Sequence, residues 1–366
     1  MSGKYDAMAL FLVDGFGWRF FEKFQNTPFL ERLSRGKVEK LTAQFPSTTA
    51  AHITTIHTGL PVGQSGIYEW FYYEPQVDRI IAPLLFSFAG DGERDTLKGQ
   101  VQATKLFPNR TMYQELGKQG IESYVFGMRN YTPSTYSNVV MKGAKQLSFK
   151  TLPEALINLG SLIENLTVPT YIHFYFGNID GTCHEYGPSA PQTEAEIEAF
   201  LLIMEHFFER VISGKKKILF LLTADHGASE VDPKTTVFLN KEKRFKGVER
   251  FIKRNQAGDL LVPAGSARDM FLYVKDEMLD EAQEFLSKRL DGKAEVVSSK
   301  WLMENGYFGS KISPQFRGRA GNLVILPHRY ESVWWYEKDK FEQRFYGHHG
   351  GLTPQEMEIP LVTLEI

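Results

Sequence analysis

Residues 7–15 read AMALFLVDG, a continuous apolar run that ends in an acidic residue and a glycine. Short apolar runs rich in β-branched and aromatic residues are typical of strands buried on both faces of a sheet. Two further runs of this kind are ILFLLT at 218–223, before Asp225-His226-Gly227, and YIHFYF at 171–176, before Asn178, Asp180 and His184. The sequence therefore predicts three buried strands that each deliver an Asp, and in two cases also a His, at their carboxyl ends.

Helical patterns lie between the apolar runs. In the clearest one, apolar residues recur at helical spacing from Ile197 to Val211, and Thr193 with Glu196 predicts a capping box at its start. The other expected elements are helices at 111–117 and 151–166 and strands at 123–126 and 361–366. Strands that alternate with helices predict an α/β fold, with helices on both faces of a mostly parallel sheet. In such sheets, functional residues gather beyond the carboxyl ends of the strands.

The charge balance excludes one class of function. The chain has 366 residues, with 42 Lys and Arg against 44 Asp and Glu, and a formal net charge of −2. A non-specific nucleic-acid binder needs a surplus of Lys and Arg to replace the counterions around the phosphates. We therefore expect no nucleic-acid partner, and any anionic ligand must be held by a local site.

The cysteine content and the short apolar runs narrow the class of protein further. The single cysteine, Cys183, excludes intramolecular disulfides and thiolate metal clusters, and we expect it to be a buried structural thiol. The run Ala7–Val13 is too short for a membrane span and lacks the flanking residues of a signal peptide. The sequence therefore predicts a cytoplasmic protein without a membrane partner.

The length suggests about two domains. The stretch 234–342 differs from the rest because it is rich in charged and aromatic residues, with a predicted helix at 277–289 and a strand-like run at 270–274. We interpret residues 234–342 as a smaller α+β insertion or cap subdomain. Residues 1–233 and 343–366 are then one catalytic α/β domain.

Seven residues form a set of candidate metal ligands: Asp14, Asp180, His184, Asp225, His226, His348 and His349. Carboxylate and imidazole ligands suit zinc, manganese or iron. The spacing of Asp180 and His184 allows both side chains to face one point, and Gly227 allows a sharp turn after Asp225-His226. The alternative is that each Asp caps a helix or turn and each His is a surface or core residue. For the whole set together, that alternative is the weaker one.

The segment FPSTTAAHITTIHTGL at 45–60 predicts a helix that begins after small hydroxyl residues and ends at Gly59. Backbone N–H groups at such a helix start can hold a phosphate while a hydroxyl attacks phosphorus. The simpler alternative is that Ser47 or Thr48 only caps the helix. Taken alone, this segment does not decide between the two.

The order of these motifs resembles the alkaline phosphatase superfamily, and within it the type I phosphodiesterase/nucleotide pyrophosphatase family in its compact bacterial form. The resemblance rests on Asp14-Gly15, Pro46-Ser47-Thr48-Thr49-Ala50-Ala51-His52 leading to Thr58-Gly59-Leu60-Pro61, Asp180-x-x-x-His184, Asp225-His226-Gly227 and His349-Gly350-Gly351. It covers almost the whole chain except the insertion. It implies a three-layer α/β/α sandwich and a phosphohydrolase that takes a small phosphorylated substrate, such as a nucleotide.

The resemblance also implies roles for individual residues. Two divalent metal ions, zinc or manganese, would be held by two sets of side chains: Asp180, His184 and His349 for one, and Asp14, Asp225 and His226 for the other. Thr49 would be the nucleophile that forms a covalent phosphothreonine, with Thr48 as the fallback. His349 is preferred to His348 as the last ligand because the family's histidine is followed directly by glycine.

The sequence departs from the family pattern where substrate would bind. Trp70 occupies the position of an asparagine that donates to the phosphate in eukaryotic members, and it opens the aromatic run Trp70-Phe71-Tyr72-Tyr73. This run could stack on a planar group of the substrate or form a buried structural cluster. Asn178 and His348 are further candidate substrate contacts.

Several other functions stay open at this point. Within the superfamily they are a phosphomonoesterase and a phosphoglycerate-mutase-like phosphotransferase. A sulfatase is disfavoured, because the nucleophile position lacks the Cys or Ser from which formylglycine is made. From another class, the alternative is a binding protein that retains the fold without turnover, and the intact ligand set argues against it.

Overall fold

The computed structural model describes residues 4–212, 214 and 216–366. A seven-stranded sheet forms one half of the molecule, in the order β2 (Lys37–Thr42), β17 (Glu358–Glu365), β9 (Ile218–Thr223), β1 (Ala7–Val13), β8 (Thr170–Phe176), β6 (Glu122–Met128) and β7 (Lys145–Phe149). Within this sheet, β17 is antiparallel to the other six strands, which all run in the same direction. The mostly parallel sheet predicted from the apolar runs is therefore confirmed.

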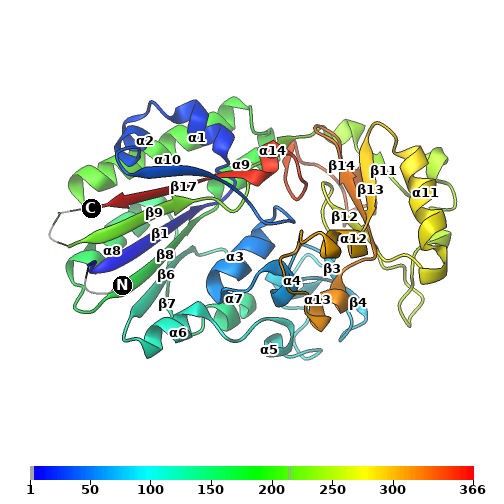
Figure 1. Ribbon diagram of the computed structural model, residues 1–366, viewed down its shortest axis with the longest axis horizontal. Coiled ribbons are helices and arrows are strands. Elements are labelled where there is room, and N and C mark those ends of the chain that lie inside the picture. The colour runs from blue at the N-terminus through cyan, green and yellow to red at the C-terminus, as the bar shows by residue number, and fades with distance from the viewer. Residues whose placement is uncertain (1–3, 213, 215) are drawn as a thin grey trace.

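Helices cover both faces of this sheet, which makes the sandwich three-layered (Figure 1). One face packs against α1 (Trp18–Phe24), α2 (Pro28–Leu33), α8 (Leu152–Glu164), α9 (Asn178–Tyr186) and α10 (Pro191–Arg210). The other face packs against α3 (Thr49–Thr58), α6 (Met112–Lys118) and α7 (Thr135–Val140). A hydrophobic core lies on each face of the sheet, and alternate residues of β1 point to one or the other. Phe11 is buried in the core on the first face, and Leu10 packs against the core on the second. This pattern is why the strand is apolar throughout.

One predicted helix start is wrong. α10 begins at Pro191 after Ala190, so Thr193 lies inside the helix and does not cap it. The Thr193 hydroxyl instead donates to the carbonyl of Gly187 at 2.8 Å. Proline at the first helical position already has no N–H to satisfy and its backbone angle is preset, which favours a start at Pro191. The predicted apolar face is correct, because Ile197, Phe200 and the residues that follow at helical spacing are buried.

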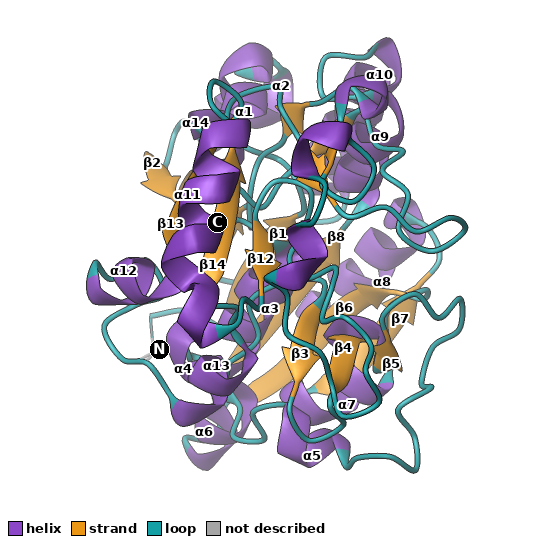
Figure 2. Cartoon of the chain, turned by 90° about the vertical axis from the view of Figure 1, so that its right-hand side faces the viewer, coloured by secondary structure: helices purple, strands orange, loops and turns teal. Residues whose placement is uncertain are grey.

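Small sheets and short helices make up the other half of the molecule (Figure 2). Its sheets are β3 (Tyr72–Glu74), β4 (Arg79–Ala82) and β5 (Ser87–Phe88); β12 (Met270–Leu272), β14 (Leu323–Pro327) and β13 (Ala294–Ser298); β11 (Val237–Phe238) and β15 (Val333–Trp334); and β10 (Ser229–Glu230) and β16 (Gly347–His348). Its helices are α4 (Val62–Ser65), α5 (Ala103–Leu106), α11 (Leu279–Arg289), α12 (Ser299–Glu304), α13 (Pro314–Arg319) and α14 (Pro354–Met357).

The segment 234–342 does not stand apart from the preceding chain. It has a core of its own around Met270 and Leu286. It also shares a second core with the residues after α3, in which Phe316 packs edge-on against Tyr68. Nearby, the fully buried Arg319 donates to Glu74 at 2.7 Å and to the carbonyl of Gly66 at 3.0 Å. The boundary at 234–342 therefore stays a prediction.

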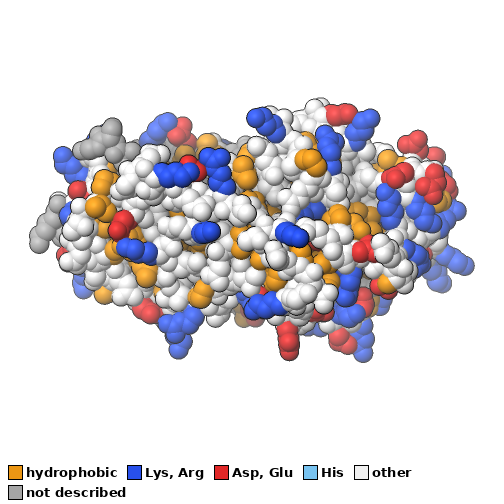
Figure 3. All heavy atoms as spheres, turned by 90° about the horizontal axis from the view of Figure 1, so that it is seen from below, with side chains coloured by type: hydrophobic (Ala, Val, Ile, Leu, Met, Phe, Trp, Pro, Cys, Tyr) orange, Lys and Arg blue, Asp and Glu red, His pale blue; other side chains and the backbone are white. Residues whose placement is uncertain are grey.

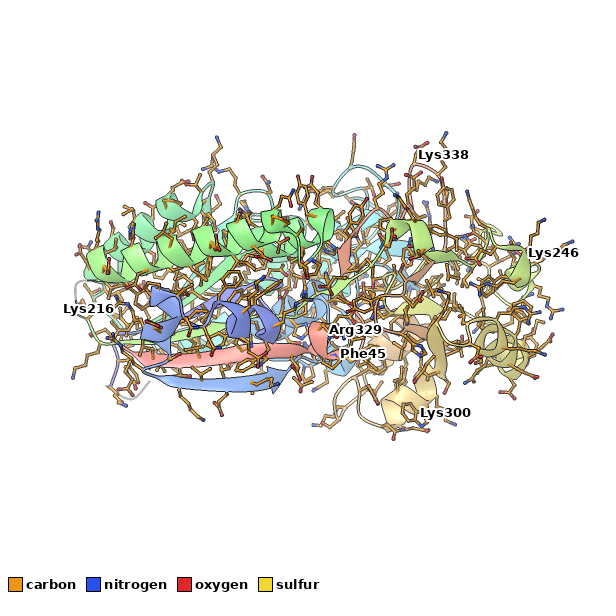
Figure 4. All side chains as sticks on the ribbon, turned by 90° about the horizontal axis from the view of Figure 1, so that it is seen from above. Phe45, Lys216, Lys246, Lys300, Arg329 and Lys338 are labelled. Atoms are coloured by element: carbon orange, nitrogen blue, oxygen red, sulfur yellow. The ribbon has the colours of Figure 1, made fainter. Side chains whose placement is uncertain are left out.

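The molecule is elongated, and the carboxyl ends of the parallel strands point to its middle (Figure 1). Lys216 precedes β9 at one end of the long axis, Lys246 lies at the other, and Phe45 lies between them (Figure 4). On the face seen in Figure 3, Lys and Arg side chains are scattered among Asp and Glu along the whole length. None of the helices in the described part of the chain has the length and apolar character needed to span a bilayer.

Candidate active site

Two neighbouring strands, β1 and β9, bring one group of candidate ligands together. Asp14 follows β1, and Asp225 and His226 follow β9. The Nε2 atom of His226 lies 3.3 Å from Asp14 Oδ1 and 3.4 Å from Asp225 Oδ2. Glycine at position 227 allows the backbone of Gln355 to approach closely, because a Cβ there would lie 2.2 Å from the carbonyl oxygen of Gln355. The adjacent residues Asp225 and His226 therefore do converge on one point.

The second group lies on α9 and on the loop after β16. Asp180 and His184 are one helical turn apart, with His184 Nε2 at 3.3 Å from Asp180 Oδ2. His349 Nε2 lies 3.7 Å from Asp180 Oδ1, and its ring stacks on that of His226 with centroids 3.6 Å apart. The ligand atoms of Asp180, His226 and His349 all lie within 4.8 Å of one another. His226 thus stands between the two groups, which form one continuous centre.

The donor atoms of this centre fit divalent metal ions. Asp14 Oδ1, Asp180 Oδ1 and Asp225 Oδ2 are buried without a hydrogen-bond partner. A buried carboxylate oxygen without a partner is costly, and a bound cation removes that cost. Carboxylate and imidazole donors without thiolates suit zinc or manganese. The sequence-based expectation of a metal centre is thus supported by the placement of these oxygens.

Backbone carbonyls orient the imidazoles for metal binding. Nδ1 donates to Gly347 O at 2.8 Å in His184, to Gly227 O at 2.9 Å in His226 and to Ser47 O at 2.9 Å in His349. A carbonyl only accepts, so Nδ1 carries a proton in each ring, and a neutral ring then has its Nε2 lone pair free for a metal ion. Burial lowers the pKa of His226 to about 4 and that of His349 to about 3, which keeps both rings neutral.

The carboxylates repel one another in this arrangement. Burial and the negative charges of Asp225 and Asp180 raise the pKa of Asp14 well above its usual range. Burial also favours the neutral form of Asp180, but His184, His349 and His226 together outweigh it and lower the pKa of Asp180. A cation at the centre would stabilise all the carboxylates in their charged form.

The hydroxyl of Thr49 also reaches this centre. Thr49 is the first residue of α3, and its Oγ1 lies 3.4 Å from Asp14 Oδ2 and 3.1 Å from His226 Nε2. Thr48 is the N-cap: its Oγ1 accepts from Ala51 N and donates to the carbonyl of Tyr68 at 3.0 Å. The predicted capping role therefore belongs to Thr48, and the hydroxyl that faces the candidate metal ligands belongs to Thr49.

A cavity of about 490 Å³ opens next to Thr49. Of the three candidate substrate contacts, Trp70 and His348 line this cavity, whereas Asn178 does not and is exposed. Asn178 and Asp180 are both on α9, and residues two apart on a helix point to nearly opposite sides, so Asn178 faces away when Asp180 faces the centre. The side chains of the aromatic run Trp70-Phe71-Tyr72-Tyr73 differ in exposure. Trp70 is 41% exposed at the cavity, whereas Tyr72 is fully buried.

Comparison with known families agrees with this geometry. The family described as type I phosphodiesterase / nucleotide pyrophosphatase matches residues 8–352. The chain belongs to the type I phosphodiesterase/nucleotide pyrophosphatase family. It is therefore a hydrolase of the alkaline phosphatase superfamily, as the order of its motifs indicates. A comparison of the sequence with curated proteins gives no match.

Solved structures of this fold include ectonucleotide pyrophosphatase/phosphodiesterase 5 from mouse and human. The murine structure has a TM-score of 0.71 at 15% identity, and the match covers 97% of this chain and 87% of that one. An inactive threonine-to-alanine variant of the murine protein in complex with AMP has a TM-score of 0.70 at 15% identity, with the same coverage. The human structure has a TM-score of 0.70 at 14% identity, also with the same coverage. These matches confirm the alkaline-phosphatase-like fold.

Sequence reasoning missed two residues that support the centre of this family member. The hydroxyl of Tyr175, near the end of β8, donates a short hydrogen bond to Asp14 Oδ2. Ser47 Oγ donates to Gly351 O at 2.8 Å and accepts from Gly350 N at 3.1 Å. Tyr175 has a hydroxyl near the carboxyl end of an apolar run, and this is the sequence signal that could have indicated it. For Ser47, the sequence predicts only a possible helix cap.

Replacing Tyr175 with phenylalanine is expected to lower metal affinity by about tenfold to a hundredfold. The Tyr175 hydroxyl holds Asp14 Oδ2, which leaves Oδ1 free to face His226. Burial and the charges of Asp14 and Asp225 raise the pKa of Tyr175, so the hydroxyl stays a donor. Competition with a chromophoric chelator measures the affinity. Tyr124→Phe is the matched control, because that hydroxyl bonds Glu122 at the surface; equal effects in both variants would contradict the assignment.

Proposed function

We propose that this family member cleaves phosphodiester or nucleotide pyrophosphate bonds with Thr49 as the nucleophile. The observation that carries the proposal is the position of the Thr49 hydroxyl, which lies beside Asp14 and His226 at the start of α3. A hydroxyl at that position can attack a phosphorus atom held at the helix N-terminus. The inactive threonine-to-alanine variant of the murine relative supports a threonine nucleophile.

Two divalent metal ions, zinc with manganese as the alternative, complete the proposed centre. Asp180, His184 and His349 would hold one ion, and Asp14, Asp225 and His226 the other. When bound, the ions would neutralise charge on the phosphate oxygens and lower the pKa of the attacking hydroxyl. The unpartnered oxygens of the three carboxylates support this assignment.

The residues of the chain supply the remaining steps. The amides of Thr49 and Ala50 make no backbone hydrogen bond among the described residues, so they can donate to a non-bridging phosphate oxygen. In the first step, Thr49 Oγ1 bonds to phosphorus, its proton goes toward Asp14 Oδ2, and the leaving group departs on the opposite side. In the second step, water bonds to phosphorus and the Thr49–phosphorus bond breaks. The proton on Asp14 Oδ2 returns to Thr49 Oγ1, and the proton lost by water leaves with the product phosphate or to solvent.

A nucleotide is the proposed substrate class. The murine relative was solved with AMP. In this chain, Trp70 and Tyr131 are exposed aromatic side chains that line the cavity beside Asp180, and an aromatic face can stack on a base. His348 lines the same cavity from β16. The volume of about 490 Å³ is within the range of small-molecule sites.

Purified protein is expected to hydrolyse bis(4-nitrophenyl) phosphate faster than 4-nitrophenyl phosphate, by about tenfold or more in kcat/KM. The monoester carries a second negative charge next to the carboxylates of Asp14 and Asp180, whereas the cavity offers room for a second ester group. Release of nitrophenolate measures both rates, with Thr49→Ala as the control for contaminating activity. Faster cleavage of the monoester would favour a phosphomonoesterase or a phosphoglycerate-mutase-like phosphotransferase.

A further inference from the structure

The lining of the active-site cavity includes two basic side chains from segments outside the seven-stranded sheet. Among its described lining residues, the Lys and Arg side chains are Arg94 and Lys340. Arg94 lies between β5 and α5, and Lys340 lies between β15 and β16. The two segments are neighbours, because a Cβ on Gly90 would lie 3.1 Å from Lys340 Cδ. Neither cation belongs to a motif that the family resemblance uses.

The two cations differ in their partners. Lys340 Nζ is paired with Glu337 at 2.7 Å. Arg94 has no ion pair and no side-chain hydrogen bond within the described ranges of the chain. An exposed guanidinium without a carboxylate partner keeps all its donors available, and it matches phosphate geometry with two parallel hydrogen bonds.

The backbone on both sides of Arg94 is anchored. The carbonyl of Glu93 accepts from Ser87 Oγ at 2.8 Å. Asp95 donates its N–H to Leu85 O at 3.0 Å, and its carboxylate accepts from Thr135 Oγ1 at 2.6 Å. These contacts tie the segment to β5 and to the start of α7. Arg94 is therefore presented to the cavity from a fixed backbone position, although its side chain is exposed.

Tyr131 links Arg94 to the reaction centre. Its ring packs against Tyr175 at 6.1 Å between centroids, and Tyr175 bonds Asp14. Burial and the charges of Asp14 and Asp180 raise the pKa of Tyr131, and Arg94 opposes this rise. The Tyr131 hydroxyl is thus within electrostatic range of both the carboxylates and Arg94. Arg94, Tyr131 and Thr49 line the same cavity, so an anionic group next to the phosphate that Thr49 would attack would share that cavity with the guanidinium.

We infer that Arg94 binds a second anionic group of the substrate, adjacent to the scissile phosphate, and so selects pyrophosphate diesters over diesters with uncharged substituents. The inference rests on the proposed diesterase function and deepens it. A phosphate next to the scissile one would meet a free guanidinium, whereas an uncharged ester group would gain nothing from it. Arg94 is then a specificity-determining residue and not part of the bond-breaking step.

A matched pair of substrates tests this role. The pair is the 4-nitrophenyl ester of thymidine 5′-monophosphate and that of thymidine 5′-diphosphate, which differ by one phosphate. Arg94→Gln is expected to lower kcat/KM for the diphosphate ester by about tenfold or more and to leave the monophosphate ester nearly unchanged. Arg94→Lys should keep part of the preference. Added salt should reduce the preference of the unaltered enzyme but not that of Arg94→Gln, because the contact is exposed and screened.

Arg110→Gln is the control variant, because Arg110 is an exposed arginine paired with Glu115 that does not line the cavity. It is expected to leave both kcat/KM values unchanged. An equal loss on both esters in Arg94→Gln would overturn the inference, since Arg94 would then serve the scissile phosphate itself. An Arg94→Gln variant with an unchanged ratio of kcat/KM for the diphosphate ester to kcat/KM for the monophosphate ester would also overturn it. If the unaltered enzyme cleaves neither ester, the proposed function fails instead, so the two failures are distinguishable.

Discussion

Thr49→Ala is expected to lower kcat for a phosphodiester by about 10³-fold or more, with the metal content per chain unchanged. The substitution removes the attacking oxygen but none of the Asp and His donors. Those donors are held by other contacts, such as the hydrogen bond from His226 Nδ1 to Gly227 O. Steady-state kinetics and elemental analysis of the same preparation measure the two quantities together.

Thr48→Ala is the matched control one residue away. Thr48 caps α3 and bonds Tyr68 O, so its loss should lower the free energy of unfolding by about 1 kcal/mol and leave most of the activity. The opposite pattern, an active Thr49→Ala and an inactive Thr48→Ala, would move the nucleophile to Thr48. Loss of metal in Thr49→Ala would show that the hydroxyl is needed to hold the centre together.

Chelation is expected to abolish turnover and to lower the midpoint of thermal unfolding by several degrees. Metal that binds only the folded state stabilises it by about 4 kcal/mol when its concentration is a thousand times the dissociation constant. Without metal, Asp14, Asp180 and Asp225 face one another with unpartnered buried oxygens. Differential scanning calorimetry with and without chelator, followed by addition of zinc or manganese, measures the effect and its reversal.

Asp225→Asn gives the corresponding control. The variant has one carboxylate fewer and one weaker ligand, so the chelator should shift its unfolding midpoint much less than that of the unaltered protein. Turnover that persists after exhaustive chelation would contradict the metal-dependent mechanism. An unfolding midpoint that does not respond to chelator would contradict metal binding at these carboxylates.

The sequence predicted the central sheet because its strands are buried on both faces, which leaves apolar runs such as Ala7–Val13 that are hard to mistake. It failed at the start of α10 because two local signals competed. The Thr193–Glu196 pattern fits a capping box with Thr193 as the N-cap, but Pro191, two residues before Thr193, is the first residue of the helix. Only the position of Gly187, set by the preceding turn, gives the Thr193 hydroxyl its partner.

The candidate site likewise contains residues that could be predicted from the sequence and residues that could not. Asp14, Asp225 and His226 could be predicted because each follows a strand of the parallel sheet, where such strands deliver their functional residues. Arg94 could not be predicted, because its position depends on a contact between Asp95 and Thr135, forty residues along the chain. No local pattern records a tertiary contact of that kind. Trp70 was found only because it stands where the family has another residue.

Ser47 connects the proposed nucleophile, Thr49, to His349, the proposed last metal ligand. It lies two residues before Thr49, its carbonyl accepts from His349 Nδ1, and its backbone and hydroxyl pair with Gly350 and Gly351. The start of α3 and the loop that carries His349 therefore move as one body. Parting these two segments to admit substrate would therefore disturb the proposed metal site. The segments of Arg94 and Lys340 also border the cavity, and we expect access and product release there.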